Sequence, residues 1–543
     1  MQAEMTNQQD PYNQPQMPMQ PPMPQGGAFV PPQGGTFVPP MPPKPMTRRA
    51  RWGQQLMAGK ALITKSLPNW FATYAFATYL VALVGVNILF SDRSTEWYFM
   101  LFGIAWVAGF FFLSVKYSKE WSVLRIHKSK AFEKKLFQTG FWIRAAYVTF
   151  IYFFYLTMTG KPHEFQAADS MSYVELAGDW AIYIDNDRFW PIFRESLEHS
   201  FSDTGYPLAI TPFIYLFGHD WGIFMILIAN ALLGAYTAVI IYRITSRSMS
   251  ETTARLAAIF CMLHPVLICY AGLTLKEVLM TYLVVLFIDL CDRLLRNKRY
   301  SFGTIAPVVA VGGSLFLFRT VLGMIAFMAL FFALVMTSGK IVSLGKKITL
   351  GVIIAGILAI SVSDNIIREI EQITSSDIRG QQETSMSKRY GTEGGKKTGN
   401  AFAKYAGAAV FAPLIFTIPF PTMVTGIEGQ EDMRLIHGGN WMRNVMSGFV
   451  ILAMVMLLLT GDWRQYTLPL AMLLGYLLML IFTEFAHSLR FHIPIMPFEM
   501  LFAAYAITNM RKKHRSWYLA WCLFVIVTCF AWNWFKLAGR GLA

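Results

Sequence analysis

The sequence predicts an all-α membrane protein that crosses the bilayer many times. Hydrophobic residues make up 55% of the 543 residues, and the mean hydropathy is +0.41. These residues gather in runs about as long as the hydrocarbon core of a bilayer is thick. Basic clusters recur in alternate connections between the runs, and basic residues collect on the cytoplasmic side of membranes. Together these observations predict about thirteen transmembrane helices.

The chain begins with a polar segment that we expect to be disordered and cytoplasmic. Residues 1–47 are rich in Gln, Pro, Met and Gly, and so cannot bury a core. No apolar stretch follows a basic start, so we expect no cleaved signal peptide. Residues 48–139 then form a basic juxtamembrane segment and two accessory spans, at about 71–90 and 97–115.

Residues 140–510 form the predicted membrane core. Its first span, at about 140–158, leads into a polar segment, 159–220. Residues 511–543 form a basic loop and a last span at about 516–534. The other spans are expected at about 221–242, 254–272, 275–291, 302–318, 321–337, 347–362, 445–460, 466–484 and 493–510.

A second large external segment is expected at 363–444. It contains an apolar piece, 406–426, that is interrupted by three prolines. If this piece crossed the membrane, every later loop would change sides and the basic cluster at 511–515 would become external. We therefore favour a re-entrant or interfacial segment, with a full crossing as the alternative.

The segment 159–220 reverses the charge of the rest of the protein. It holds ten acidic residues against three Lys and Arg, whereas the formal net charge of the chain is +15. This reversal predicts an external loop, and carboxylates just outside a bilayer suggest a site for a membrane-bound substrate. If residues 168–184 form a helix on the membrane, Asp169 and Tyr173 share one face. Asp169 would equally serve as an N-cap.

Cations are expected at the same membrane face as this loop. Lys276 precedes Glu277 between two spans, Arg319 lies at the end of another, and Arg490 lies between His487 and His492. A single cation at a helix end is usually a side chain that reaches the interface and has no further role. Three at one face predict a site for the phosphate of a lipid head group.

Five sequence pieces then occur in a fixed order. They are ADSMSYVELA (168–177), TGYPLAITPFIYLFG (204–218), LHPVLICYAGLTLKE (263–277), LFLFRT (315–320) and HSLRFHIPIMPF (487–498). In order and spacing they resemble the polytopic glycosyltransferases of the GT-C fold, which include relatives of protein O-mannosyltransferases and aminoarabinose transferases. The resemblance covers roughly residues 140–510 and implies a GT-C-like core with external juxtamembrane helices in the first large loop.

The resemblance implies transfer of a sugar from a polyprenyl-phosphate donor to a glycan, lipid or protein acceptor on the non-cytoplasmic face of the cell membrane. The acid of the first loop, here Asp169, would be the catalytic base. The chain lacks a second acid beside Asp169, so a divalent metal is possible but not certain, and Glu164 or Asp179 is a candidate second acid. The substrate-binding candidates are Tyr173, Lys276, Glu277, Arg319, His487 and Arg490.

Two other functions are weighed against this one. A polymerase or ligase of lipid-linked glycans, of the O-antigen type, would depend on Arg434, His437 and Arg443 in the second external segment. A transporter or flippase would carry charged residues in the middle of its spans, where we find few.

The five cysteines lie in or beside apolar runs and form no metal or disulfide pattern. No basic–aromatic platform for nucleic acid is found, and the basic excess is expected to meet membrane lipids.

Overall fold

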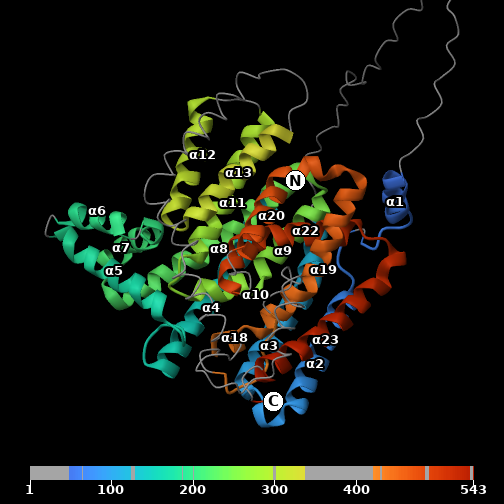
Figure 1. The fold of residues 1–543 in the computed structure, drawn as a ribbon, viewed down its shortest axis with the longest axis horizontal. Coiled ribbons are helices and arrows are strands. Elements are labelled where there is room, and N and C mark those ends of the chain that lie inside the picture. The colour runs from blue at the N-terminus through green and yellow to red at the C-terminus, as the bar shows by residue number, and fades with distance from the viewer. Residues whose placement is uncertain are drawn as a thin grey trace, which may run out of the picture. The chain divides into compact units, whose positions relative to one another are not determined.

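The computed structural model describes residues 48–63, 65–123, 129–185, 188–199, 201–297, 301–336, 420–427, 431–482, 488–538 and 542. Helices dominate this part of the chain, and its only β-type pairings are two isolated bridges, Ala61 with Arg511 and Ser94 with Val424. The predicted all-α class is therefore confirmed for the described residues (Figure 1). The predicted tail, residues 1–47, lies outside them.

The helices have the following bounds, in chain order. They are α1 Arg48–Met57, α2 Asn69–Leu89, α3 Trp97–Ser122, α4 Ser129–Thr159, α5 Ala168–Asp185, α6 Phe189–His199, α7 Gly205–Phe217, α8 His219–Ser248, α9 Glu251–Leu263, α10 Pro265–Cys269, α11 Glu277–Asn297, α12 Phe302–Ser314, α13 Thr320–Met336, α18 Glu431–Leu435, α19 His437–Thr460, α20 Thr467–Phe482, α21 Leu489–His492, α22 Met496–Asn509 and α23 Arg515–Ala538. Among the short 3-10 turns, η3 is Phe201–Asp203, η4 is Tyr270–Gly272 and η5 is Leu315–Leu317.

Eight helical stretches in the described residues are long and apolar enough to cross a membrane. A ninth is obtained if α9 and the α10–η4 turn, which meet at an angle of 49°, count as one broken span. The protein is therefore a multi-pass membrane protein. Helices α11, α12 and α13 fall on three further predicted runs, and the run at 347–362 lies outside the described residues. The total of thirteen spans stays a prediction.

Helix α22 lies at the centre of the helix packing. It contacts α19, α9, α8 and α20, and it is buried over most of its length. Small residues such as Ala503, Ala504 and Ala506 are fully buried here, and small side chains let helices approach closely in a membrane. Helix α8 packs against α4, α9 and α11, and α2 lies beside α23 (Figure 1). The two spans that precede the predicted core thus pack against later helices, because α3 also contacts α9 and α19.

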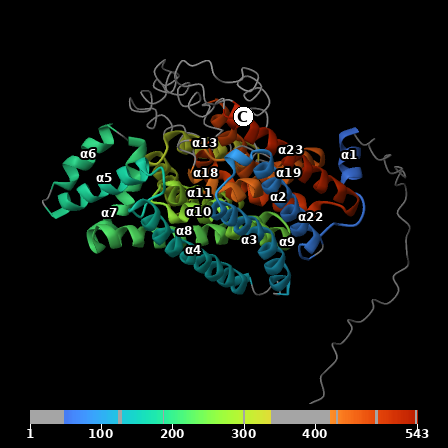
Figure 2. The ribbon, with the colours of Figure 1, turned by 90° about the horizontal axis from the view of Figure 1, so that it is seen from below.

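The described residues between 168 and 217 form the helices α5, α6 and α7 and the turn η3, and the three helices lie together in both ribbon views (Figure 2). The predicted helix at 168–184 is present as α5. Helix α7 packs on α5 and brings the ring of Tyr206 to 5.5 Å from that of Tyr173. A Cβ atom on Gly205 would lie 2.9 Å from the carbonyl oxygen of Leu317, so this approach of α7 to η5 requires glycine.

The end of the predicted apolar piece 406–426 is held between α23 and the turn before α3. The backbone N–H of Met423 donates to Asn533 Oδ1 at 2.7 Å, and Trp532 Nε1 donates to Thr422 Oγ1 at 3.2 Å. The N–H of Thr425 donates to the carbonyl of Arg93 at 2.9 Å. Residues 406–419 lie outside the described residues, so the re-entrant path stays a prediction.

Candidate functional site

A cavity of about 520 Å³ lies where the two predicted external segments meet. Its walls come from the end of α4, the loop into α5, the α10–η4 turn, α18, α21 and α23. The cavity is both charged and aromatic. Its charged lining residues are Glu164, Asp169, Asp432, Arg490 and Lys536, and its aromatic ones are Tyr155, Tyr270, Phe491 and Trp532.

Arg490 joins two carboxylates at this cavity. Its Nη1 donates to Asp169 Oδ2, and its Nε donates to Glu277 Oε1. The Asp169 side chain is 58% exposed, whereas that of Glu277 is fully buried. A buried carboxylate needs a partner of opposite charge. Glu277 therefore anchors the guanidinium from behind while Asp169 meets it from the open side.

Glu164 lies in the loop between α4 and α5, and its side chain is buried. Burial raises the pKa of this carboxyl to about 7, and the nearby charge of Asp432 acts in the same direction. Asp432 Oδ2 accepts a hydrogen bond from the backbone N–H of Gln166 at 3.2 Å. Burial raises the pKa of Asp432 to about 6. Asp432 thus ties the loop that precedes Asp169 to α18.

Lys276 forms a second cluster, which does not line the cavity. Its Nζ donates to Asp203 Oδ1 and, at 2.8 Å, to the carbonyl of Phe318, and only 7% of its side chain is exposed. The hydroxyl of Tyr173 donates to the same Asp203 oxygen at 3.0 Å. Burial favours a high pKa for Asp203, but the Lys276 ammonium and these two hydrogen bonds outweigh it and lower that pKa. This cluster holds α5, η3 and η5 together.

Arg319 lies behind the cavity wall. Its Nη1 donates to the Tyr476 hydroxyl at 2.9 Å, and its guanidinium lies 4.2 Å from the ring centre of Phe491. Phe491 lines the cavity, so Arg319 supports the wall by a cation–π contact. Asp179 is exposed on α5 and is not among the cavity-lining residues, and His487 lies outside the described residues.

The structure thus brings the predicted site residues close together but in two groups. Glu164, Asp169 and Arg490 line the cavity, whereas Lys276 and Arg319 pack beside it. The sequence reasoning missed the cavity-lining Asp432 and Lys536. A signal was available for Lys536, because it follows the predicted last span at the same face as Asp169. No such signal singled out Asp432.

Within the described residues, no group of three or more His, Cys, Asp or Glu is placed to hold a metal ion. Glu164 and Asp432 are two neighbouring carboxyls without a third ligand of this kind. The buried environment that raises the pKa of both favours their protonated forms. This part of the chain therefore does not present a protein-built metal site.

The residues that a glycan polymerase would use do not line the cavity themselves, although Met433 and Leu435, on either side of Arg434, do. Arg434 pairs with Glu96 at 2.7 Å, and His437 Nε2 lies 3.0 Å from the carbonyl oxygen of Phe99. Arg443 is held by two partners at once. It donates to Glu499 at 2.8 Å and to His492 Nδ1 at 2.7 Å. The residues that line the cavity do not include Arg434, His437 or Arg443.

No family model, curated protein or solved structure matches this chain. The geometry places an exposed acid, an anchored arginine and several aromatic rings around one space.

Proposed function

We propose that this protein is a membrane glycosyltransferase with a GT-C-like core. It would move a sugar from a polyprenyl-phosphate donor to a cell-envelope acceptor on the non-cytoplasmic face of the cell membrane, with its N-terminus in the cytoplasm. One observation carries the proposal. Asp169 and Arg490, 321 residues apart in the chain, meet in one cavity lined by aromatic rings.

The cavity has the size and lining that a sugar phosphate requires. Its volume of about 520 Å³ falls within the range of small-molecule sites. Arg490 and Lys536 supply positive charge for a phosphate, which arginine binds by charge-assisted hydrogen bonds. The ring of Tyr270 offers an apolar face with a polar edge, which suits a sugar ring, whereas Trp532 carries Lys536 over its ring, with Nζ 4.8 Å from the ring centre.

Arg490 connects donor binding to the activation of Asp169. In the structure its Nη1 holds Asp169, while its Nε is anchored by the buried Glu277. We propose that the donor phosphate takes the place of Asp169 on Nη1. Arg490 stays in position through Glu277, and Asp169 is released toward the acceptor as a general base.

In the transfer step, Asp169 accepts the proton of the acceptor O–H or N–H as that atom bonds to the anomeric carbon of the sugar. The bond between the anomeric carbon and the phosphate oxygen breaks, and polyprenyl phosphate leaves with the electron pair. Arg490 and Lys536 stabilise the negative charge that develops on this oxygen.

The alternative functions have less support. The polymerase or ligase candidates Arg434 and Arg443 are engaged with Glu96 and Glu499 and are not among the residues that line the cavity. A transporter needs charges along a path through the membrane. The buried Arg144 in α4 instead donates to three backbone carbonyls, of Gly140, Cys261 and Met262.

The test is Asp169→Asn in purified protein supplied with labelled polyprenyl-phosphate sugars. Transfer should fall by about 10²–10⁴-fold, the usual contribution of a general base, while membrane insertion is unchanged. Glu175→Gln is the matched control, because Glu175 is exposed on the same helix and is not among the cavity-lining residues. Transfer by the Asn variant at the level of this control would remove Asp169 from the mechanism.

A further inference from the structure

Two carboxyl groups that line the cavity, those of Glu164 and Asp432, have no positively charged partner in the described part of the chain. One oxygen of each, Glu164 Oε2 and Asp432 Oδ1, is buried and accepts no hydrogen bond from the described residues. Only 6% of Glu164 is exposed. A buried acceptor without a partner costs free energy, so these two oxygens call for an explanation.

Other buried carboxylates of this protein are paired within the protein itself. Among the described residues, each of the three buried carboxylates other than Glu164 has an arginine as its partner. The pairs are Glu277 with Arg490, Asp289 with Arg247 and Glu499 with Arg443. Glu164 departs from this pattern at the place where the protein opens into a cavity, so a ligand can supply the missing cation.

The loop that carries Glu164 is fixed on both sides of this residue. His163 Nδ1 and Thr274 Oγ1 lie 3.3 Å apart and share a hydrogen bond. The ring of Phe165 lies 5.5 Å from the ring of Tyr155. The carboxyl group of Glu164 is therefore held in place before a ligand arrives, as a binding residue should be.

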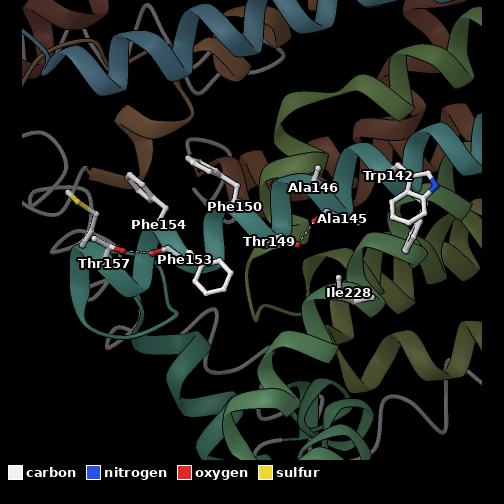
Figure 3. Close-up of a pocket in the computed structure, with 11 residues that line it drawn as sticks. Trp142, Ala145, Ala146, Thr149, Phe150, Phe153, Phe154, Thr157 and Ile228 are labelled. Carbon is white, nitrogen blue, oxygen red and sulfur yellow. Dashed lines mark hydrogen bonds between the residues drawn. The ribbon is translucent and has the colours of Figure 1, made fainter.

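The open groove along α4 shows the contrast. It has a volume of about 850 Å³ and is lined by α4 and by Ile228 of α8, without a charged residue (Figure 3). Its two threonines, Thr149 and Thr157, donate their hydroxyls to carbonyls of their own helix, at 2.9 and 2.8 Å. Nothing in this lining selects one ligand over another. The free oxygens of Glu164 and Asp432, in contrast, select a group that donates hydrogen bonds.

A positively charged donor suits this pair of carboxyls better than a neutral one. The charge of Asp432 raises the pKa of Glu164, which means that the two carboxylates repel each other. An ammonium group relieves this repulsion and has three N–H donors. Tyr155 and Tyr270 line the same cavity, and aromatic rings attract ammonium groups as well.

The charge of the pair also indicates which substrate it meets. The donor phosphate is expected on Arg490 and Lys536, and two carboxylates that acted on the same group would oppose its binding. Glu164 lies in the loop that leads into α5 and to Asp169. Asp169 is the group that takes the proton of the acceptor, so the carboxyl pair is on the acceptor side.

We propose that Glu164 and Asp432 bind a primary ammonium group of the acceptor, at a position separate from the O–H or N–H that Asp169 deprotonates. The inference rests on the proposed function, since it takes the second substrate to be an acceptor. It narrows the acceptor to a glycan, lipid or protein that carries an amino group. The two carboxyls then determine specificity and take no part in the transfer step.

The first experiment measures binding and needs no transfer. Full-length protein in detergent, with EDTA to remove divalent metals, is titrated with two matched pairs of ligands. One pair is an alkyl aminoglycoside and its parent alkyl glycoside, and the other is a lysine-containing peptide and the same peptide with norleucine. The amino member of at least one pair should bind about 10–100-fold more tightly, the usual effect of charge-assisted hydrogen bonds. Equal affinities within both pairs would overturn the inference.

The second experiment neutralises the carboxyls. Glu164→Gln and Asp432→Asn keep the size of the side chain and one carbonyl oxygen, which in Asp432→Asn can still accept from the N–H of Gln166. In each variant the preference for the amino ligand should fall to within about twofold. Glu175→Gln and Asp179→Asn are the matched controls, because both residues are exposed on α5 and are not among the cavity-lining residues. A full preference in both cavity variants would contradict the assignment.

The third experiment asks whether the amino group belongs to the donor instead. Polyprenyl-phosphate sugars are compared in the same way, each as an amino sugar and as its hydroxyl parent. A preference among these donors, with none among the acceptor pairs, would overturn the acceptor assignment. Tight binding of amino acceptors without transfer from any donor would count against the proposed function, while the ammonium site would stand.

Discussion

Lys276 and Glu277 are neighbours in the chain but belong to different ion-pair clusters. Glu277 holds Arg490, which reaches Asp169 at the cavity, whereas Lys276 is enclosed by Asp203 and the carbonyl of Phe318. Both clusters pair a cation with two oxygen partners. Only the Arg490 cluster lines the cavity, because its second carboxylate, Asp169, stands at the open side. A charged residue that the sequence predicts at the same membrane face as Asp169 does not therefore have to line the cavity. Whether such a cation reaches the cavity depends on the side chains with which it pairs.

The largest effect is expected at Arg490. Arg490→Gln removes the phosphate ligand and leaves the buried Glu277 unpaired, so transfer should fall at least about 100-fold and stability by about 3–5 kcal/mol. Arg490→Lys keeps the charge but cannot bridge both carboxylates in the same geometry, so transfer should fall while stability is better kept. Transfer rates and thermal unfolding in detergent measure the two effects. Wild-type transfer by the Lys variant would show that the bridge has no role.

Lys276 should show the opposite pattern, with a loss of stability rather than of donor binding. Lys276→Gln leaves Asp203 and Tyr173 without their cation, and the free energy of unfolding should fall by about 2 kcal/mol. The folded fraction should keep a donor KM close to wild type, because Lys276 does not line the cavity. A well-folded variant with a strongly raised donor KM would instead return Lys276 to the phosphate site that the sequence predicts.

The most gradual effect is a pH dependence of stability that comes from Glu164. Burial raises its pKa from 4.5 to about 7, so the folded protein binds its proton more tightly than the unfolded chain does. Its stabilising contribution is full below about pH 4.5 and is lost as the pH rises through about 7, with a limit of about 3 kcal/mol. Asp432 acts in the same direction, since its pKa is raised to about 6.

In Glu164→Gln the melting temperature should therefore fall less steeply between pH 5 and 8 than in the wild type. Part of the fall should remain, because Asp432 still titrates. Melting curves of wild type and variant across this range are the measurement. Identical slopes for the two proteins would show that Glu164 is not the group that titrates.

The sequence predicted the all-α class and the multi-pass membrane character, because hydropathy acts over many residues at once, and eight or nine of the described helical stretches are long and apolar enough to span. Helix α5 begins at Ala168 and ends at Asp185, almost as expected from the pattern at 168–184. The acid and the arginine that meet at the cavity, Asp169 and Arg490, were both among the predicted site residues. Both residues were selected because the hydropathy and charge pattern of the chain predicts that they lie at one membrane face.

The partners of these residues could not be predicted, because they depend on helix rotation and on contacts between distant segments. No spacing rule assigns Lys276 to Asp203 and Glu277 to Arg490, although the two residues are adjacent. The link from Asp432 to Gln166 joins segments 266 residues apart. Helix α7 was also missed as a separate helix, because its residues fall in the segment 159–220, before the next predicted span at about 221–242.

The central claim is that Asp169 and Arg490 form the site of sugar transfer from a lipid phosphate. The most direct measurement is the release of polyprenyl phosphate, together with labelled acceptor, from polyprenyl-phosphate sugars in vesicles that contain the purified protein. Wild-type protein should release one lipid phosphate for each sugar transferred, and Asp169→Asn should release almost none. No release by the wild type from any polyprenyl-phosphate sugar, or equal release by the Asn variant, would contradict the claim.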